Sequence, residues 1–142
     1  MIGYYLMFNN NCGEALEIYE KAFGAKVLHK QTYGDMPLNP DFPVAVEDKE
    51  LILNVQFEIA GTVLMASDVG EFSADKGSNM YVTITTENKE LVTKAWEMLK
   101  EGGEVINDLQ STFFAELHGS LRDKFGISWM FSVSVGGTSI DK

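Results

Sequence analysis

This chain of 142 residues has few cysteine and basic residues, and this composition excludes several classes of protein. It has one cysteine, Cys12, which excludes an internal disulfide framework and is typical of a reducing cytoplasm. Eleven Lys and Arg residues face twenty-one Asp and Glu residues, and Arg122 is the single arginine. The resulting formal net charge of −10 disfavours nucleic acid and anionic membranes as partners, because both attract clustered cations.

Long apolar runs are also lacking, and we expect no secretory signal. The most apolar stretch, residues 51–66, contains Asn54, Gln56 and Glu58, so we expect no membrane span. The N-terminus MIGYYLMFNNN has no cationic start, and we expect a cytoplasmic protein. The only three prolines lie within residues 34–50, which we interpret as a loop or a lid.

The order of predicted elements occurs twice along the chain. Asn11 is a candidate N-cap for the first helix, with Glu14 completing a capping box. The predicted strands are residues 4–8, 26–33, 51–59 and 62–66, then 80–85, 104–109, 115–122 and 127–135. One predicted helix begins after residue 11, and the other spans residues 90–100. This order predicts an α+β fold in which two βαβββ modules form one domain.

We place the first module at about residues 3–67 and the second at about 80–135. A polar linker of about residues 68–79 joins them, and a small polar tail, residues 136–142, is expected to fray.

Alternation along the strands divides each predicted sheet into an apolar and a polar face. A polar sheet face is most often simply solvated. The repeat favours a second interpretation, in which the two polar faces enclose a cleft for a small ligand. Its predicted lining is Asn54, Gln56, Glu116, His118, Ser128 and Met130.

Five segments carry a resemblance to a known family. They are YLMFNNNCGEALEIYEKAFGAKV, YGDMP at Tyr33, TVLMASD at Thr62, DLQSTFF at Asp108 and RDKFGISWMF at Arg122. In this order they resemble the PhnB-like branch of the vicinal oxygen chelate superfamily, which includes glyoxalase I and fosfomycin resistance proteins. The resemblance implies paired βαβββ modules around a cleft and, in this branch, commonly a homodimer.

The resemblance also identifies where metal-using relatives carry their ligands. The matching positions here are Tyr4 or Tyr5, Met65, Met80 or Tyr81, and Met130. Thioethers and a phenol are poor ligands for divalent ions that prefer carboxylate, imidazole or water. We therefore predict no metal at the family's usual site and no other cofactor, and leave open a divalent metal elsewhere.

Glu116 and His118 are the candidate catalytic residues. Their i, i+2 spacing would project both from one strand face, where they could transfer protons, although two solvent-facing side chains would show the same spacing. The candidate substrate-binding residues are Asn54, Gln56, Gln110 and Met130. Cys12 is interpreted as a packed thiol.

Three functions remain open at this point. The first is a metal-free protein that binds a small organic molecule in the cleft. The second is a lyase, isomerase or resistance-type enzyme that uses Glu116 as base. The third is a dimerising domain without a small ligand. The acidity of the chain disfavours phosphonates and favours a neutral or cationic ligand.

Overall fold

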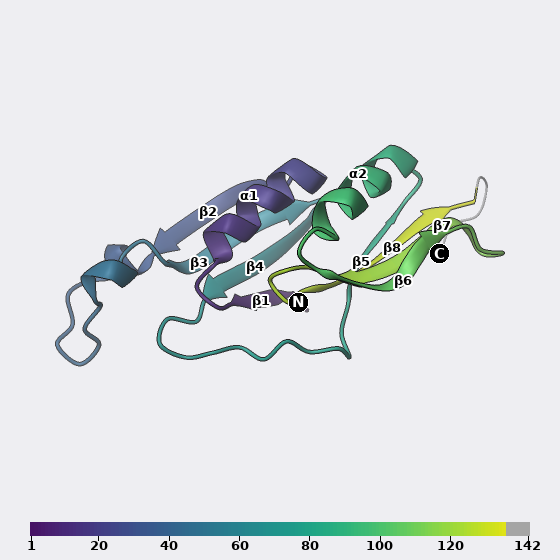
Figure 1. Ribbon diagram of the computed structural model, residues 1–142. Coiled ribbons are helices and arrows are strands. Elements are labelled where there is room, and N and C mark those ends of the chain that lie inside the picture. Colours follow the sequence, from purple (N-terminus) through teal and green to yellow (C-terminus); the bar gives the residue numbers. More distant parts are fainter. Residues whose placement is uncertain (136–142) are drawn as a thin grey trace. The chain divides into compact units, whose positions relative to one another are not determined.

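The computed structural model describes residues 1–135 and contains two compact units (Figure 1). The first unit is Met1–Asp75, and the second begins at Lys76. Each unit has a four-stranded mixed sheet and one helix, in the order βαβββ. The α+β fold predicted from the sequence is therefore confirmed. The predicted tail, residues 136–142, lies outside the described residues.

The first unit contains β1 (Tyr5–Phe8), α1 (Cys12–Phe23), β2 (Lys26–Thr32), β3 (Ile52–Ile59) and β4 (Thr62–Asp68). Its sheet has the order β1-β4-β3-β2, with β1 parallel to β4 and the other pairs antiparallel. The long connection between β2 and β3 carries two short 3₁₀ turns, η1 (Tyr33–Asp35) and η2 (Val46–Asp48).

Aromatic packing holds α1 to its sheet. Tyr19 is fully buried and stacks on Phe57 of β3, with 6.3 Å between the ring centroids. Phe8 and Phe23 also pack on Tyr19, at 6.4 and 6.2 Å. Burial of each such ring contributes on the order of 2–3 kcal/mol, which fixes the helix on one face of the sheet.

The start of α1 differs from the prediction. Asn11 occupies the N-cap position, but its side chain makes no capping hydrogen bond. Instead, Oδ1 of Asp68 accepts the backbone N–H of Cys12 at 2.9 Å, and Oδ2 accepts the N–H of Ile52 at 2.8 Å. The predicted capping hydrogen bond of Asn11 is therefore wrong: a buried carboxylate from the end of β4 binds the helix start instead. β4 thus extends through Asp68, two residues beyond the predicted end at Ala66.

The second unit contains β5 (Val82–Thr86), α2 (Lys89–Leu99), β6 (Glu104–Gln110), β7 (Ala115–Arg122) and β8 (Ser128–Ser134). Its sheet has the order β5-β8-β7-β6, which matches the first sheet strand for strand. α2 is capped locally, because Oδ1 of Asn88 accepts the N–H of Leu91 at 3.0 Å. Trp96 of α2 packs edge-on against Phe131 of β8, at 5.9 Å.

The two β-hairpins turn in different ways. Ala60 (φ 49°) and Gly61 (φ 87°) join β3 to β4 in left-handed conformations, as a tight two-residue turn requires. Between β7 and β8, the buried carboxylate of Asp123 accepts the N–H groups of Phe125 and Ile127 and the indole N–H of Trp129. Asp123 therefore fixes this second turn.

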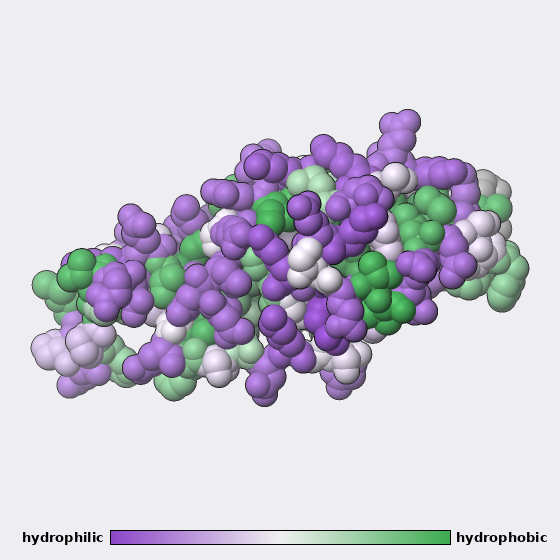
Figure 2. Space-filling model, in the orientation of Figure 1, coloured by the Kyte–Doolittle hydropathy of each residue, from purple (hydrophilic) through white to green (hydrophobic). Residues whose placement is uncertain are grey.

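The surface is mostly hydrophilic on the face shown in Figure 2, with hydrophobic side chains gathered in separate patches. Within residues 1–135, no helix has the length and apolar character needed to cross a bilayer.

Candidate functional site

The second sheet has one face covered by α2 and one face that the helix does not cover. Trp96 packs on Phe131, so the side chains that alternate with Phe131 along β8 belong to the helix-free face. Strand register extends this face: Met130 lies opposite Thr83 of β5 and Ser120 of β7. We call this surface the β7–β8 polar face; it comprises Thr83, His118, Ser120, Arg122, Ser128, Met130 and Ser132.

Within residues 1–135, four buried atoms on the β7–β8 polar face have no hydrogen-bond partner. They are Nδ1 of His118, Nε of Arg122, Oγ of Ser128 and Oγ of Ser132. The register sets them in two neighbouring pairs, His118 opposite Ser132 and Arg122 opposite Ser128. A buried polar atom left unpaired costs about 1–3 kcal/mol, so this concentration is expected where a bound molecule supplies the partners.

Other side chains shape the surroundings of these atoms. The ring of Phe114 lies edge-on to the imidazole of His118, with 5.0 Å between centroids. Nδ2 of Asn107 donates to Oγ of Ser120 at 3.3 Å, so this serine is satisfied internally. Glu104 lies 3.6 Å from the guanidinium of Arg122 and offsets its charge. The face thus combines hydroxyl groups, one partly neutralised cation and an aromatic edge.

The two candidate catalytic residues have different surroundings. Glu116 is half-exposed, and its carboxylate forms an ion pair at 3.3 Å with Lys89, the first residue of α2. Between Ala115 and Leu117, β7 advances two residues while β8 advances one, so a bulge at Glu116 interrupts the alternation assumed by the i, i+2 spacing. Within residues 1–135, no hydrogen bond or ion pair joins the Glu116 carboxylate to His118, and their catalytic pairing stays a prediction.

The candidate binding residues divide between the two sheets. Gln110 is exposed at the end of β6, opposite His118, and Met130 is half-buried on β8. Asn54 and Gln56 belong to β3 in the first unit, where Nδ2 of Asn54 donates to the Tyr5 hydroxyl at 3.3 Å. The predicted cleft joining both sets stays a prediction.

The positions that correspond to the family's metal ligands do not fit a metal. Tyr5 lies opposite Met65, and Met130 lies opposite Thr83. These side chains offer a phenol, thioethers and a hydroxyl, which divalent ions bind poorly. Across residues 1–135, no three His, Cys, Asp or Glu side chains form a group that could hold a metal ion.

Cys12 is fully buried at the start of α1. Burial, reinforced by the negative charge of Asp68, raises the pKa of its thiol to about 12. At neutral pH the side chain is therefore protonated and a poor nucleophile, consistent with a packed thiol.

The candidate site residues do not include four members of the β7–β8 polar face: Thr83, Ser120, Arg122 and Ser132. A signal for Ser132 was present in the sequence, because serine recurs at alternate positions of SWMFSVS on a strand whose other side chains are apolar. The missing information was burial: the same alternation also describes a solvated strand.

Comparison with known proteins places the chain in a family. The family model described as 3-demethylubiquinone-9 3-methyltransferase matches residues 1–132. Protein YjdN of Escherichia coli strain K12 is 28% identical over 135 residues, which cover 91% of this chain and 92% of that protein.

Two solved structures share the fold over nearly their whole length. Protein PA1353 from Pseudomonas aeruginosa is 28% identical, with a TM-score of 0.77 and coverage of 93% of this chain and 96% of that chain. A Bacillus cereus structure described as a putative 3-demethylubiquinone-9 3-methyltransferase, PhnB protein, is 22% identical, with a TM-score of 0.73 and coverage of 92% and 97%. The chain therefore belongs to the family described as 3-demethylubiquinone-9 3-methyltransferase.

Proposed function

We propose that this protein binds a small neutral organic molecule on the β7–β8 polar face, without the metal used by other members of the superfamily. The observation that supports the proposal is the group of four unpartnered buried atoms on two adjacent strands. Ser128 and Ser132 are only 5% and 7% exposed, so water has little access to their hydroxyl groups.

The hydrogen-bonding groups define the chemistry of the ligand. Nε of Arg122 can only donate, whereas the two serine hydroxyls can donate and accept. The ligand therefore needs an acceptor oxygen together with a hydroxyl or a second carbonyl. Glu104 offsets the charge of Arg122, which favours a neutral molecule over an oxyanion. The ring of Phe114 beside His118 would contact a planar or aromatic body.

Binding has more support than catalysis by Glu116. A general base must reach the substrate with a free carboxylate, but Glu116 is half-exposed and paired with Lys89. The enzymatic alternative is tested by Glu116→Gln: a large loss of turnover on a substrate found by screening would support it.

Catechol and its dimethyl ether, veratrole, test the binding proposal as a matched pair. Both are neutral and planar, but only catechol can donate hydrogen bonds. In an NMR titration of the ¹⁵N-labelled protein, catechol should shift the amide signals of β7 and β8, with an affinity several-fold above that of veratrole. Perturbations confined to other strands, or equal affinities, would contradict the proposal.

Serine-to-alanine variants locate the binding groups. The double variant Ser128→Ala, Ser132→Ala should weaken catechol binding by about tenfold, because about 1.4 kcal/mol of hydrogen bonding is lost. Ser67→Ala is the matched control: Ser67 is also buried, on β4 of the first sheet, and its hydroxyl already donates to the sulfur of Met7. An equal loss in both variants would contradict the assignment.

We also propose a homodimer, as the family resemblance implies. Tyr5 and Met7 of β1, and Tyr4 just before it, have nearly half-exposed side chains, and a second copy would cover such a surface. Analytical ultracentrifugation should give twice the chain mass of 15.8 kDa, and a species at 15.8 kDa would contradict the dimer.

A further inference from the structure

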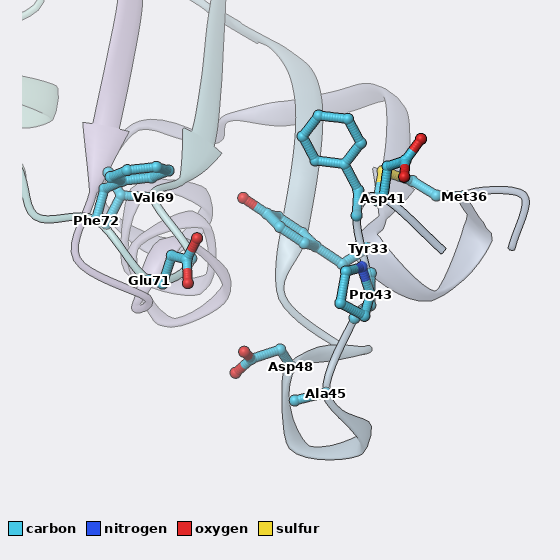
Figure 3. A pocket seen from close by; sticks show the side chains of 12 residues that line it. Tyr33, Met36, Asp41, Pro43, Ala45, Asp48, Val69, Glu71 and Phe72 are labelled. Carbon is cyan, nitrogen blue, oxygen red and sulfur yellow. The ribbon is translucent and has the colours of Figure 1, made fainter. Parts of the chain in front are cut away.

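The first unit contains a pocket built by two loops. The connection between β2 and β3 supplies one wall, and residues 69–72, which follow β4, supply the other. The volume is about 360 Å³, within the range of small-molecule sites. In Figure 3, the hydroxyl end of Tyr33 points towards the side on which Val69, Glu71 and Phe72 lie, and Asp41 and Pro43 lie on the other side.

Hydrogen bonds fix both walls of the pocket. The Tyr33 hydroxyl donates to the backbone carbonyl of Asp68 at 2.9 Å and ties the first loop to the end of β4. The side chain of Asn10 holds Gly70 by both backbone groups, at 2.8 and 2.9 Å. Gly70 has a φ of 71°, and a Cβ there would lie 3.2 Å from the Tyr33 hydroxyl. The pocket is thus supported by the fold although its walls are loops.

The lining combines aromatic rings with negative charge. Tyr33, Phe42 and Phe72 contribute rings. The hydrophobic patch at the left end of Figure 2 lies over the connection between β2 and β3. The lining also has three carboxylates, Asp41, Asp48 and Glu71, and no Lys, Arg or His. None of the three carboxylates has an ion-pair partner within residues 1–135.

The electrostatic surroundings of Tyr33 agree with this composition. Burial raises the pKa of the Tyr33 hydroxyl, and the charges of Asp68 and Asp48 are among the groups that raise it further. Negative charge therefore acts on the interior of the pocket.

These features select one chemical class of ligand. The carboxylates do not form a group close enough to hold a metal ion in the part of the chain that is described. Carboxylates spread around aromatic rings instead attract a larger, weakly hydrated cation, because the faces of the rings also attract positive charge. We propose that this pocket binds a small organic cation, an ammonium group with an apolar body.

Choline and 3,3-dimethylbutan-1-ol test the proposal, because they have the same shape and differ in charge. In NMR titrations at 0.15 M salt, choline should shift the amide signals of Tyr33 and Gly70. Its affinity should exceed that of the neutral alcohol by about tenfold or more, as a cation–π contact plus a carboxylate predicts. Equal affinities, or shifts confined to the second sheet, would overturn the proposal.

Isosteric variants distinguish the effect of the pocket carboxylates on binding from the effect of the chain's net negative charge. Asp48→Asn and Glu71→Gln should each weaken choline binding about threefold or more without altering the rest of the spectrum. Glu47→Gln is the matched control, since Glu47 belongs to the same 3₁₀ turn as Asp48 but does not line the pocket. An equal loss with Glu47→Gln would overturn the proposal. The variants of Ser128 and Ser132 should leave choline binding unchanged.

Discussion

The two units have the same strand order and the same connections, but they use their polar groups differently. In the first sheet, Asn54 donates to Tyr5 and Ser67 donates to Met7. In the second sheet, four buried atoms on two adjacent strands have no hydrogen-bond partner among residues 1–135. The same strand order thus carries satisfied polar groups in the first sheet and unpartnered ones in the second, where we propose the ligand site.

The helix starts and the loops differ as well. Asp68 reaches α1 from the end of β4, whereas Asn88 caps α2 from the adjacent position. The first unit has a long connection between its second and third strands, residues 33–51, which builds the acidic aromatic pocket. The equivalent connection in the second unit is only residues 111–114. The longer connection therefore carries a pocket, while the strand order of the two sheets stays the same.

The largest expected difference between the units is in the capping of their helices. Asp68→Ala leaves two buried backbone N–H groups unpaired and should lower the free energy of unfolding by about 3 kcal/mol. Asn88→Ala removes a solvent-exposed cap and should cost about 1 kcal/mol. Urea unfolding measures both, and equal losses would show that the two caps are equivalent.

Alkaline pH should destabilise the first unit through Cys12. The folded thiol has a pKa of about 12 against an ordinary value of 9.0, so its stabilising effect is complete below pH 9 and is lost as the pH rises towards 12. Between pH 8.5 and 10.5 the contribution should fall by about 2 kcal/mol. Cys12→Ala removes this part of the pH dependence, and urea titrations at both pH values measure the difference. An identical pH profile in the variant would contradict it.

Two serines of the second sheet should respond in opposite ways to replacement by alanine. Ser120 accepts a hydrogen bond from Asn107, so Ser120→Ala should cost about 1 kcal/mol. Ser132 has an unpartnered hydroxyl, so Ser132→Ala should leave the ligand-free protein equally stable or more stable, by up to about 1 kcal/mol. Thermal unfolding without ligand tests the pair. A larger loss for Ser132→Ala would show that its hydroxyl is already satisfied.

The smallest effect is expected at the first hairpin. Ala60 has a φ of 49°, a conformation that asparagine tolerates better than alanine, and Asn-Gly is the preferred sequence for this turn. Ala60→Asn should therefore raise the unfolding free energy by about 0.5 kcal/mol. Calorimetry of the variant measures the change, and a lower melting temperature would contradict the assignment.

The fold could be predicted from the sequence because its main signals are local. Strand alternation and the apolar stripes of the helices gave the element order, and the predicted bounds of β7 match the structure. The buried carboxylates were missed for a physical reason: Asp68 and Asp123 stand beside turn-forming polar residues, where an acid is normally solvated, and their partners come from other segments.

The candidate sites were harder to predict. The i, i+2 spacing of Glu116 and His118 assumes regular alternation, and a bulge at Glu116 interrupts it. The unpartnered state of Ser132 depends on which groups surround it in three dimensions, and no sequence pattern records that. The pocket of the long connection consists of loop side chains without periodicity, so composition indicated a loop but not its charge or its rings.

The bond between Asp68 and Cys12 also bears on the order in which the protein folds. These residues are 56 positions apart, so the start of α1 gains its partner only after β4 has paired with β1. The cap of α2 spans three residues and can form in an otherwise unfolded chain. Helical structure should therefore appear earlier at α2 than at α1 during refolding, even though ribosomes synthesise α1 first.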